Sequence, residues 1–176
     1  MDKQSLVDML LALDEEVLLS LGEFQKKPAV VIVGGAAFML RDITRRGVTH
    51  DIDILQADRT VREIISHYPN INGAVAAYMD QIPYNFEDRL EVLDIGAQAI
   101  TFLTPSTEDM AVMKLYAERP QDIQDLDSAA ASGRIDWKLL DRLVHDPDEA
   151  RASALSERRY REMVGAYQRF RRRAGK

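Results

Sequence analysis

Two carboxylates one residue apart, Asp51 and Asp53, stand inside the apolar run HDIDIL and are well suited to chemistry. Alternate side chains of a β-strand share a face, so these carboxylates would project together and repel each other unless a cation offsets their charge. Mg²⁺ and Mn²⁺ accept carboxylate ligands, and Mg²⁺ usually keeps positions open for water or substrate phosphates. The pair therefore predicts a site for Mg²⁺ or Mn²⁺, whereas a solvated strand face is the simpler alternative.

A pair of glycines, Gly34 and Gly35, precedes these carboxylates, between the β-branched run AVVIV and the helix-forming run AAFMLRDIT. Without side chains, backbone N–H groups and the positive end of a helix can approach a phosphate closely. Arg46, in the following loop, could contact a triphosphate in bidentate fashion. The glycine pair alone could be a tight turn, and the D-x-D pattern alone could be a solvated strand face. Their combination, in this order along the chain, favours phosphoryl or nucleotidyl transfer.

Helical and strand periodicities predict the elements that must position these residues. Ser5 is the expected N-cap of the first helix and Gly22 its end. Residues 69–89 lack a sustained period and are expected to be loop with some helix. The elements expected are helices over 5–21, 36–44, 59–68, 104–118, 121–133, 136–144 and 148–176, strands over 29–33 and 50–58, and two strands around Gly96 within 89–103. Strands alternating with helices and followed by helices predict an α/β or α+β fold with a helical C-terminal part.

The composition and charge of the chain exclude several classes of function. The 176 residues are 46% hydrophobic, which is enough for one sizeable core, and the formal charge of −6 argues against a generally basic nucleic-acid coat. Since cysteine is absent, disulfides, thiolate metal sites and thiol nucleophiles are excluded. Acidic residues interrupt the apolar start of the chain, so we expect no membrane association and a cytoplasmic location.

The run VGGAAFMLRDITRRGVTHDIDIL resembles the first motifs of the DNA polymerase beta-type nucleotidyltransferase superfamily, in particular the AbiEii-like toxins and related small nucleotidyltransferase-like bacterial proteins. The stretch EDMAVMKLYAERPQDIQDLDSA resembles its later motif, with matches at Lys114, Asp122 and Asp125. This resemblance implies a nucleotidyltransferase fold with a small mixed central sheet flanked by helices. It also implies a nucleotidyltransferase-like domain over 1–130, including the N-terminal helix, and a helical extension with a basic tail over 131–176.

The resemblance further implies the roles of individual residues. A third carboxylate usually activates the attacking hydroxyl, and Asp94 and Glu91 compete for that role, with Asp94 favoured. If neither reaches the site, the chain would bind nucleotide without transferring it. The expected catalytic residues are Asp51, Asp53 and Asp94, the expected metal ligands are Asp51 and Asp53, and the expected nucleotide-binding residues are Gly34, Gly35, Arg46, Thr49, Lys114 and Asp122.

The expected substrate is an NTP, and the acceptor could be tRNA or another RNA, a protein or a small molecule. The resemblance also raises a role in toxin–antitoxin or abortive-infection systems, with a cognate antitoxin or partner protein. The alternative is an inactive nucleotidyltransferase-fold protein that binds nucleotide or a protein partner. The basic, aromatic-containing tail SERRYREMVGAYQRFRRRAGK could contact RNA, pack on the domain or dock on an acidic partner.

Overall fold

The computed structural model describes residues 1–22 and 26–176, which divide into two compact units. The sheet unit comprises Met1–Arg41, Arg46–Ala77 and Glu91–Thr104. The helical unit comprises Asp42–Arg45, Tyr78–Leu90 and Pro105–Lys176. No helix in the described part of the chain is both long enough and apolar enough to cross a membrane.

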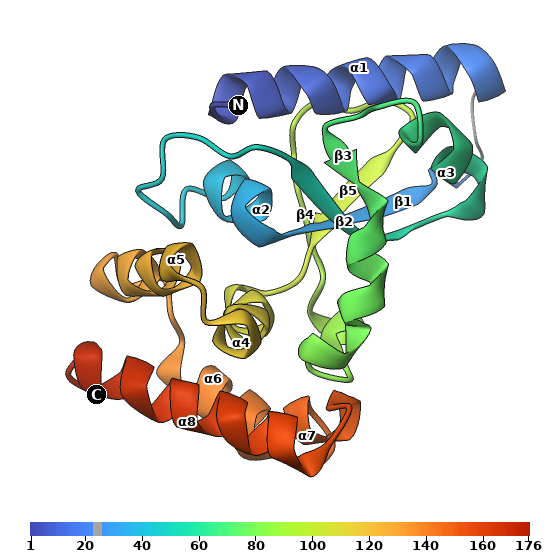
Figure 1. Cartoon of the computed structure of the whole chain (residues 1–176). Helices are drawn as coiled ribbons and strands as arrows, with labels where there is room; N and C mark the ends of the chain where they lie inside the picture. Colours follow the sequence, from blue (N-terminus) through green and yellow to red (C-terminus); the bar gives the residue numbers. More distant parts are fainter. Residues whose placement is uncertain (23–25) are drawn as a thin grey trace. The chain divides into compact units, whose positions relative to one another are not determined.

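The sheet unit contains one mixed five-stranded sheet in the order β3-β2-β1-β5-β4 (Figure 1). The central strand β1 runs antiparallel to β2 and parallel to β5, while β2/β3 pair in parallel and β4/β5 antiparallel. The strands are β1 (Ala29–Val33), β2 (Ile52–Ala57), β3 (Ile71–Asn72), β4 (Glu91–Val92) and β5 (Thr101–Thr104). This arrangement confirms the predicted α/β fold with a small mixed sheet.

The pairing of β1 with β2 brings the two ends of the candidate motif together. Val33, the last residue of β1, lies opposite Asp53 near the start of β2. Because the strands are antiparallel, the glycines that follow β1 lie beside the carboxylates that open β2. The glycines and the carboxylates are therefore far apart in sequence but close together in the fold.

Three helices accompany this sheet: α1 (Lys3–Leu21), α2 (Gly34–Leu40) and α3 (Arg59–Ile65). The predicted end of α1 at Gly22 is confirmed, since Gly22 has φ +72°. The predicted N-cap was wrong: Asp2 caps the helix and accepts a hydrogen bond from the N–H of Ser5 at 2.8 Å. The helix after β1 includes both glycines and ends at Leu40, earlier than the predicted residue 44.

A buried carboxylate on α1 fixes the chain before β5. Asp14 is 4% exposed, and its two oxygens accept hydrogen bonds from the N–H groups of Gln98, Ala99 and Ile100 at 2.7, 2.9 and 2.7 Å. These donors precede β5, the parallel neighbour of β1. Asp14 therefore stabilises the entry into one of the two strands that flank β1.

The helical unit holds the later helices and the second half of η1. Tyr78, inside η1, departs from helical geometry at the point where the chain passes between the two units. The predicted terminal helix is interrupted at residues 154–156, so α7 and α8 replace it. The remaining helices are η1 (Gly73–Gln81), η2 (Phe86–Arg89), α4 (Thr107–Ala117), α5 (Pro120–Ala131), α6 (Trp137–His145), α7 (Ala150–Ser153) and α8 (Glu157–Arg173).

An ion-pair network joins three segments of the helical unit. The Arg89 guanidinium donates to both oxygens of Asp109 at 2.8–3.2 Å and to both oxygens of Glu149 at 3.0 Å. Burial alone would lower the pKa of Arg89, but the two carboxylates outweigh it and raise that pKa. Arg89 is therefore a permanent cation that ties η2 to α4 and to the start of α7.

Candidate functional site

The first glycine of the pair makes room for a carboxylate. Gly34 has φ +72°, and a Cβ at this position would lie 2.5 Å from Asp53 Oδ2, which is closer than real Cβ contacts come. Both observations require glycine: the backbone conformation is strained for other residues, and the neighbouring space is occupied. The Asp53 carboxylate thus lies directly against the backbone at the start of α2.

The second glycine makes room for a guanidinium. A Cβ at Gly35 would overlap Arg46 Nη1 and would lie 3.4 Å from Thr49 Oγ1. Arg46 and Thr49 come from the loop between α2 and β2, so the fold brings this loop back to the glycine pair. The predicted residues Gly34, Gly35, Arg46, Thr49 and Asp53 are therefore close neighbours.

Asp51 and Asp53 alternate with buried isoleucines at the start of β2. Ile52 and Ile54 are buried, whereas Asp51 and Asp53 are half-buried, which confirms the predicted alternation. The buried Thr49 hydroxyl donates to the backbone carbonyl of Asp51 at 3.3 Å. Through this contact Thr49 links the backbone of the first carboxylate to the second glycine.

Asn72 of β3 is a site residue that sequence reasoning missed. Asn72 lies opposite Asp53 in the pairing of β2 with β3, and its side-chain N–H donates to Asp53 Oδ1 at 3.0 Å. Since β3 has only two residues, it shows no alternation in the sequence, and only the turn-forming run PNING marks its position. Asn72 restricts the Asp53 carboxylate to one orientation.

We call Gly34, Gly35, Arg46, Thr49, Asp51 and Asp53 the glycine-pair cluster. Its donor set, two carboxylates with a guanidinium beside glycine backbone, matches a hard divalent cation together with the phosphates of a nucleotide. Across residues 1–22 and 26–176, no three His, Asp or Glu side chains gather at one point to hold a metal. The chain therefore offers two carboxylates here, which suits a cation that completes its coordination with water and substrate oxygens.

The predicted third carboxylate lies outside regular structure. Because β4 ends at Val92, Asp94 follows the strand and is exposed, and strand alternation does not govern its direction. Glu91 is on β4, also exposed, and pairs with Arg41 Nη2 at 2.6 Å. The catalytic role of Asp94 stays a prediction.

Lys114, Asp122 and Asp125 form a buried cluster within the helical unit. The Lys114 ammonium contacts Asp122 Oδ1 at 3.1 Å and Asp125 Oδ2 at 2.8 Å, and Thr44 Oγ1 donates to Asp125 Oδ1 at 2.7 Å. Burial alone would raise the pKa of Asp122, but Arg119 and Lys114 outweigh it and hold that pKa below its ordinary value. The two carboxylates thus orient Lys114, while nucleotide binding by Lys114 and Asp122 stays a prediction.

The C-terminal helix α8 packs on its own unit. Tyr167 and Phe170 are 1% and 0% exposed, so they are core residues and not stacking platforms. Most of the arginines face carboxylates of the same chain; Arg169, for example, contacts both oxygens of Glu118 at 2.6–2.7 Å. The other pairs are Arg158 and Arg159 with Glu162, Arg161 with Glu157, Arg171 with Asp141 and Arg173 with Asp127. The structure therefore favours the packing alternative for the basic tail over RNA contact.

Comparison with known proteins places the chain in a protein family. No curated protein and no solved structure matches the chain. A protein family does match, over residues 8–174, which is nearly the whole chain and includes every residue of the cluster. The chain belongs to this family, described as "Nucleotidyltransferase of unknown function (DUF6036)".

Proposed function

We propose that the protein transfers an NMP group from an NTP to an acceptor hydroxyl in a reaction that depends on Mg²⁺ or Mn²⁺. One observation carries this proposal: the glycine pair has a carboxylate, Asp53, packed on one glycine and a guanidinium, Arg46, packed on the other. A cation held by the carboxylates and a phosphate held by the guanidinium would then meet at the same turn of backbone.

Each residue of the cluster has a role in this proposal. Asp51 and Asp53 would hold the cation, and Gly34 and Gly35 would offer backbone N–H groups to the phosphates. Since α2 has only seven residues, its dipole contributes little, and Arg46 supplies most of the positive charge. Thr49 and Asn72 would position the carboxylates. A bound Mg²⁺ would stabilise negative charge that develops on the phosphate oxygens.

The proposed step exchanges one P–O bond for another. The acceptor oxygen attacks the α-phosphorus, the bond from this phosphorus to the bridging oxygen breaks, and pyrophosphate leaves with its electron pair. A carboxylate takes the hydroxyl proton, and Asp94 is the residue we propose for this role. The acceptor is proposed to be RNA or tRNA, a protein or a small molecule.

Calorimetry with and without Mg²⁺ tests the site. Without a cation, Asp51 and Asp53 repel a triphosphate, so Asp53→Asn should abolish Mg²⁺-dependent NTP binding and should bind NTP more tightly than wild type does in EDTA. Asp8, exposed on α1 and bonded to Gln4, provides a control that removes the same charge. If Asp53→Asn binds NTP in Mg²⁺ as well as wild type and Asp8→Asn do, the proposed metal site is wrong.

A second candidate function is nucleotide binding without transfer. It is favoured by the exposure of Asp94 outside β4 and by the pairing of Glu91 with Arg41, since no strand directs Asp94 and Glu91 already meets a cation. Incubation with α-labelled NTP, Mg²⁺ and pools of RNA, protein and small hydroxyl compounds separates the two functions. Label transferred to any acceptor, and lost in Asp53→Asn, supports the enzyme; Mg²⁺-dependent binding without transfer supports the binding protein.

We also propose the finer kinship with AbiEii-like toxins, on the strength of the GG, R-x-x-T and D-I-D motifs. This proposal includes a cytoplasmic location and a cognate antitoxin or other partner protein. Induced expression of the wild type and of Asp53→Asn in a bacterial host tests it. Growth arrest by the wild type alone would support a toxin that acts by nucleotidyl transfer, and equal growth would count against it.

A further inference from the structure

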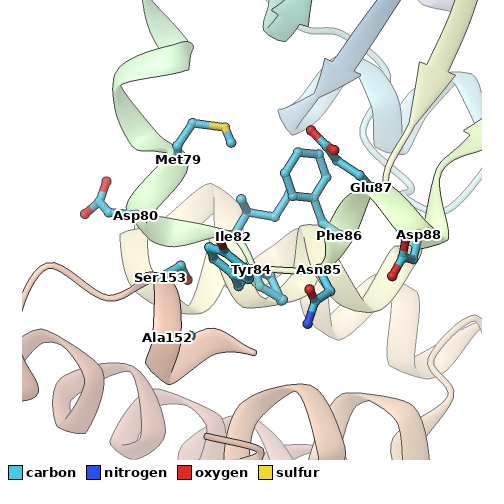
Figure 2. Close-up of a pocket in the computed structure, with 11 residues that line it drawn as sticks. Met79, Asp80, Ile82, Tyr84, Asn85, Phe86, Glu87, Asp88, Ala152 and Ser153 are labelled. Atoms are coloured by element: carbon cyan, nitrogen blue, oxygen red, sulfur yellow. The ribbon is translucent and has the colours of Figure 1, made fainter. Parts of the chain in front are cut away.

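The helical unit contains a cavity of about 580 Å³ that the proposed reaction does not use. Its walls come from the end of η1, the loop from Pro83 to Asn85, η2 and α7. Ile82, Pro83 and Phe86 are buried and form its apolar base, as Figure 2 shows for Ile82 and Phe86. This volume lies within the range of about 300–1,000 Å³ that is typical of binding pockets. We call it the Tyr84 groove.

The groove is built on a rigid frame. Glu149, which Arg89 holds on both oxygens, also accepts from the N–H of Asn85 at 3.4 Å, and its carbonyl accepts from the N–H of Tyr84 at 3.4 Å. The Asn85 side chain donates to the carbonyl of Asp148 at 3.1 Å. The loop that carries Tyr84 is therefore fastened to the start of α7, so a ligand would meet a preformed surface and lose little affinity to ordering.

The rim of the groove is negatively charged. Asp80, Glu87 and Asp88 line it, and no Lys, Arg or His is among its described lining residues. In Figure 2 the three carboxylates stand at the outer edge of the labelled side chains, with Phe86 and Ile82 between them. A ligand that complements this rim must carry positive charge.

Large apolar side chains are exposed in and beside the groove. Tyr84 is 67% exposed and Met79 is 37% exposed, and both line it; Tyr78, adjacent in sequence, is 51% exposed. Tyrosine and methionine are enriched in protein interfaces, and a tyrosine ring also attracts cations. The exposed apolar surface thus extends past the charged rim. A small hydrophilic polyamine could pair with the rim but would leave this apolar surface uncovered.

We propose that the Tyr84 groove binds a segment of a partner protein that carries an arginine or lysine next to an aromatic or aliphatic residue. The cationic head pairs with Asp80, Glu87 and Asp88, while its aliphatic stem and the neighbouring apolar residue cover Tyr84 and Met79. A second copy of this chain fits less well, because most arginines of α8 are already paired within the chain. This binding does not depend on nucleotidyl transfer.

Peptide selection tests the proposal on the full chain. A phage library of random peptides is panned against the wild type, and the selected peptide is labelled and titrated by fluorescence anisotropy. We expect peptides with a basic residue beside an apolar one, and at least about tenfold weaker binding to Asp80→Asn/Glu87→Gln/Asp88→Asn and to Tyr84→Ala. The matched control, Asp127→Asn/Glu157→Gln/Glu162→Gln, removes the same charge from the helical unit outside the groove and should bind within about twofold of wild type.

Three outcomes would overturn the proposal. The first is selection of peptides without a basic residue, or of none at all. The second is equal affinity of the groove variants and the control variant for the selected peptide. The third is a demonstration that spermidine binds as tightly as the peptide and is equally sensitive to the groove variants, since this would make the site one for small polyamines. Circular dichroism of each variant verifies that the fold is retained.

Discussion

Replacing Gly34 with alanine tests whether the close approach of Asp53 to the glycine pair is a real constraint. An alanine at φ +72° costs about 1 kcal/mol in backbone conformation, because its Cβ crowds the carbonyl oxygen. The new Cβ would also lie 2.5 Å from Asp53 Oδ2, so the carboxylate has to move and its 3.0 Å hydrogen bond from Asn72 is lost or weakened. The loss of such a bond costs about 1 kcal/mol.

We therefore expect Gly34→Ala to lower the free energy of unfolding by about 2 kcal/mol in urea denaturation. Gly96 provides a control, because it also has a positive φ, +83°, in the same unit, and no described atom lies within 4 Å of a Cβ built there. Gly96→Ala should cost only the backbone contribution of about 1 kcal/mol. The difference between the two variants in free energy of unfolding measures the cost of displacing the Asp53 carboxylate.

A double-mutant cycle isolates that displacement. In an Asp53→Ala background the carboxylate is absent, so Gly34→Ala should cost about 1 kcal/mol, the same as Gly96→Ala. The coupling between the two positions is then about 1 kcal/mol. Equal costs of Gly34→Ala in the presence and absence of the Asp53 carboxylate would refute the close contact, and with it the geometry on which the proposed site depends.

Other variants probe the positions of single groups. Asp14→Ala leaves three N–H groups before β5 without their acceptor and should cost about 3 kcal/mol in urea denaturation; a cost below that of an exposed Asp8→Ala would contradict the role of Asp14. Lys114→Met removes the ammonium that the buried carboxylates of Asp122 and Asp125 share, and leaves Asp122 its exposed partner Arg119; it should cost about 3–5 kcal/mol at pH 7, so an unchanged unfolding midpoint would count against this cluster. Since the fold lowers the pKa of Asp122, its stabilisation is present above the ordinary aspartate pKa of about 4 and is lost as the pH falls through the lowered pKa, and Asp122→Asn should flatten this acid limb. Thr49→Val removes the hydroxyl that holds the Asp51 carbonyl and should weaken Mg²⁺-dependent NTP binding about tenfold, whereas Thr49→Ser should preserve it.

The core of the site was predictable because its signals are local. A β-branched run, two glycines, a helical run and an alternating strand follow one another in residues 29–57, and each pattern depends on neighbours in sequence. The structure confirms the strands and the alternation of Asp51 and Asp53 against Ile52 and Ile54. The antiparallel direction of β1 and β2, which makes one cluster of these residues, has no such local signal.

Contacts between distant residues escaped prediction for the same reason. Asp14 meets the chain at Gln98, and Arg89 meets Glu149, through hydrogen bonds that nothing in the spacing of these residues indicates. The break between α7 and α8 was missed because residues 148–176 are rich in helix-forming residues both before and after the break at residues 154–156. In the tail, the arginines suggested an RNA-binding surface, but carboxylates face most of them. Some of these carboxylates lie on α8 itself, such as Glu162, and others lie on different segments, such as Asp141 of α6.

Whether the protein transfers a nucleotide or only binds it depends on a third carboxylate near β4, a strand of two residues. A regular strand over residues 89–95 would send Glu91 and Asp94 to opposite faces, so that at most one of them could point inward with Asp51 and Asp53. In the structure β4 stops at Val92, so Asp94 takes its direction from the loop before Gly96, where φ is +83°. The carboxylates of Asp51, just before β2, and Asp53, on β2, suffice to hold a cation with a nucleotide, whereas proton transfer from an acceptor also needs a base within hydrogen-bond reach. Since nothing regular directs Asp94 toward β2, the geometry supports cation and nucleotide binding more strongly than it supports catalysis, and detection of transferred label is the decisive observation for an enzyme.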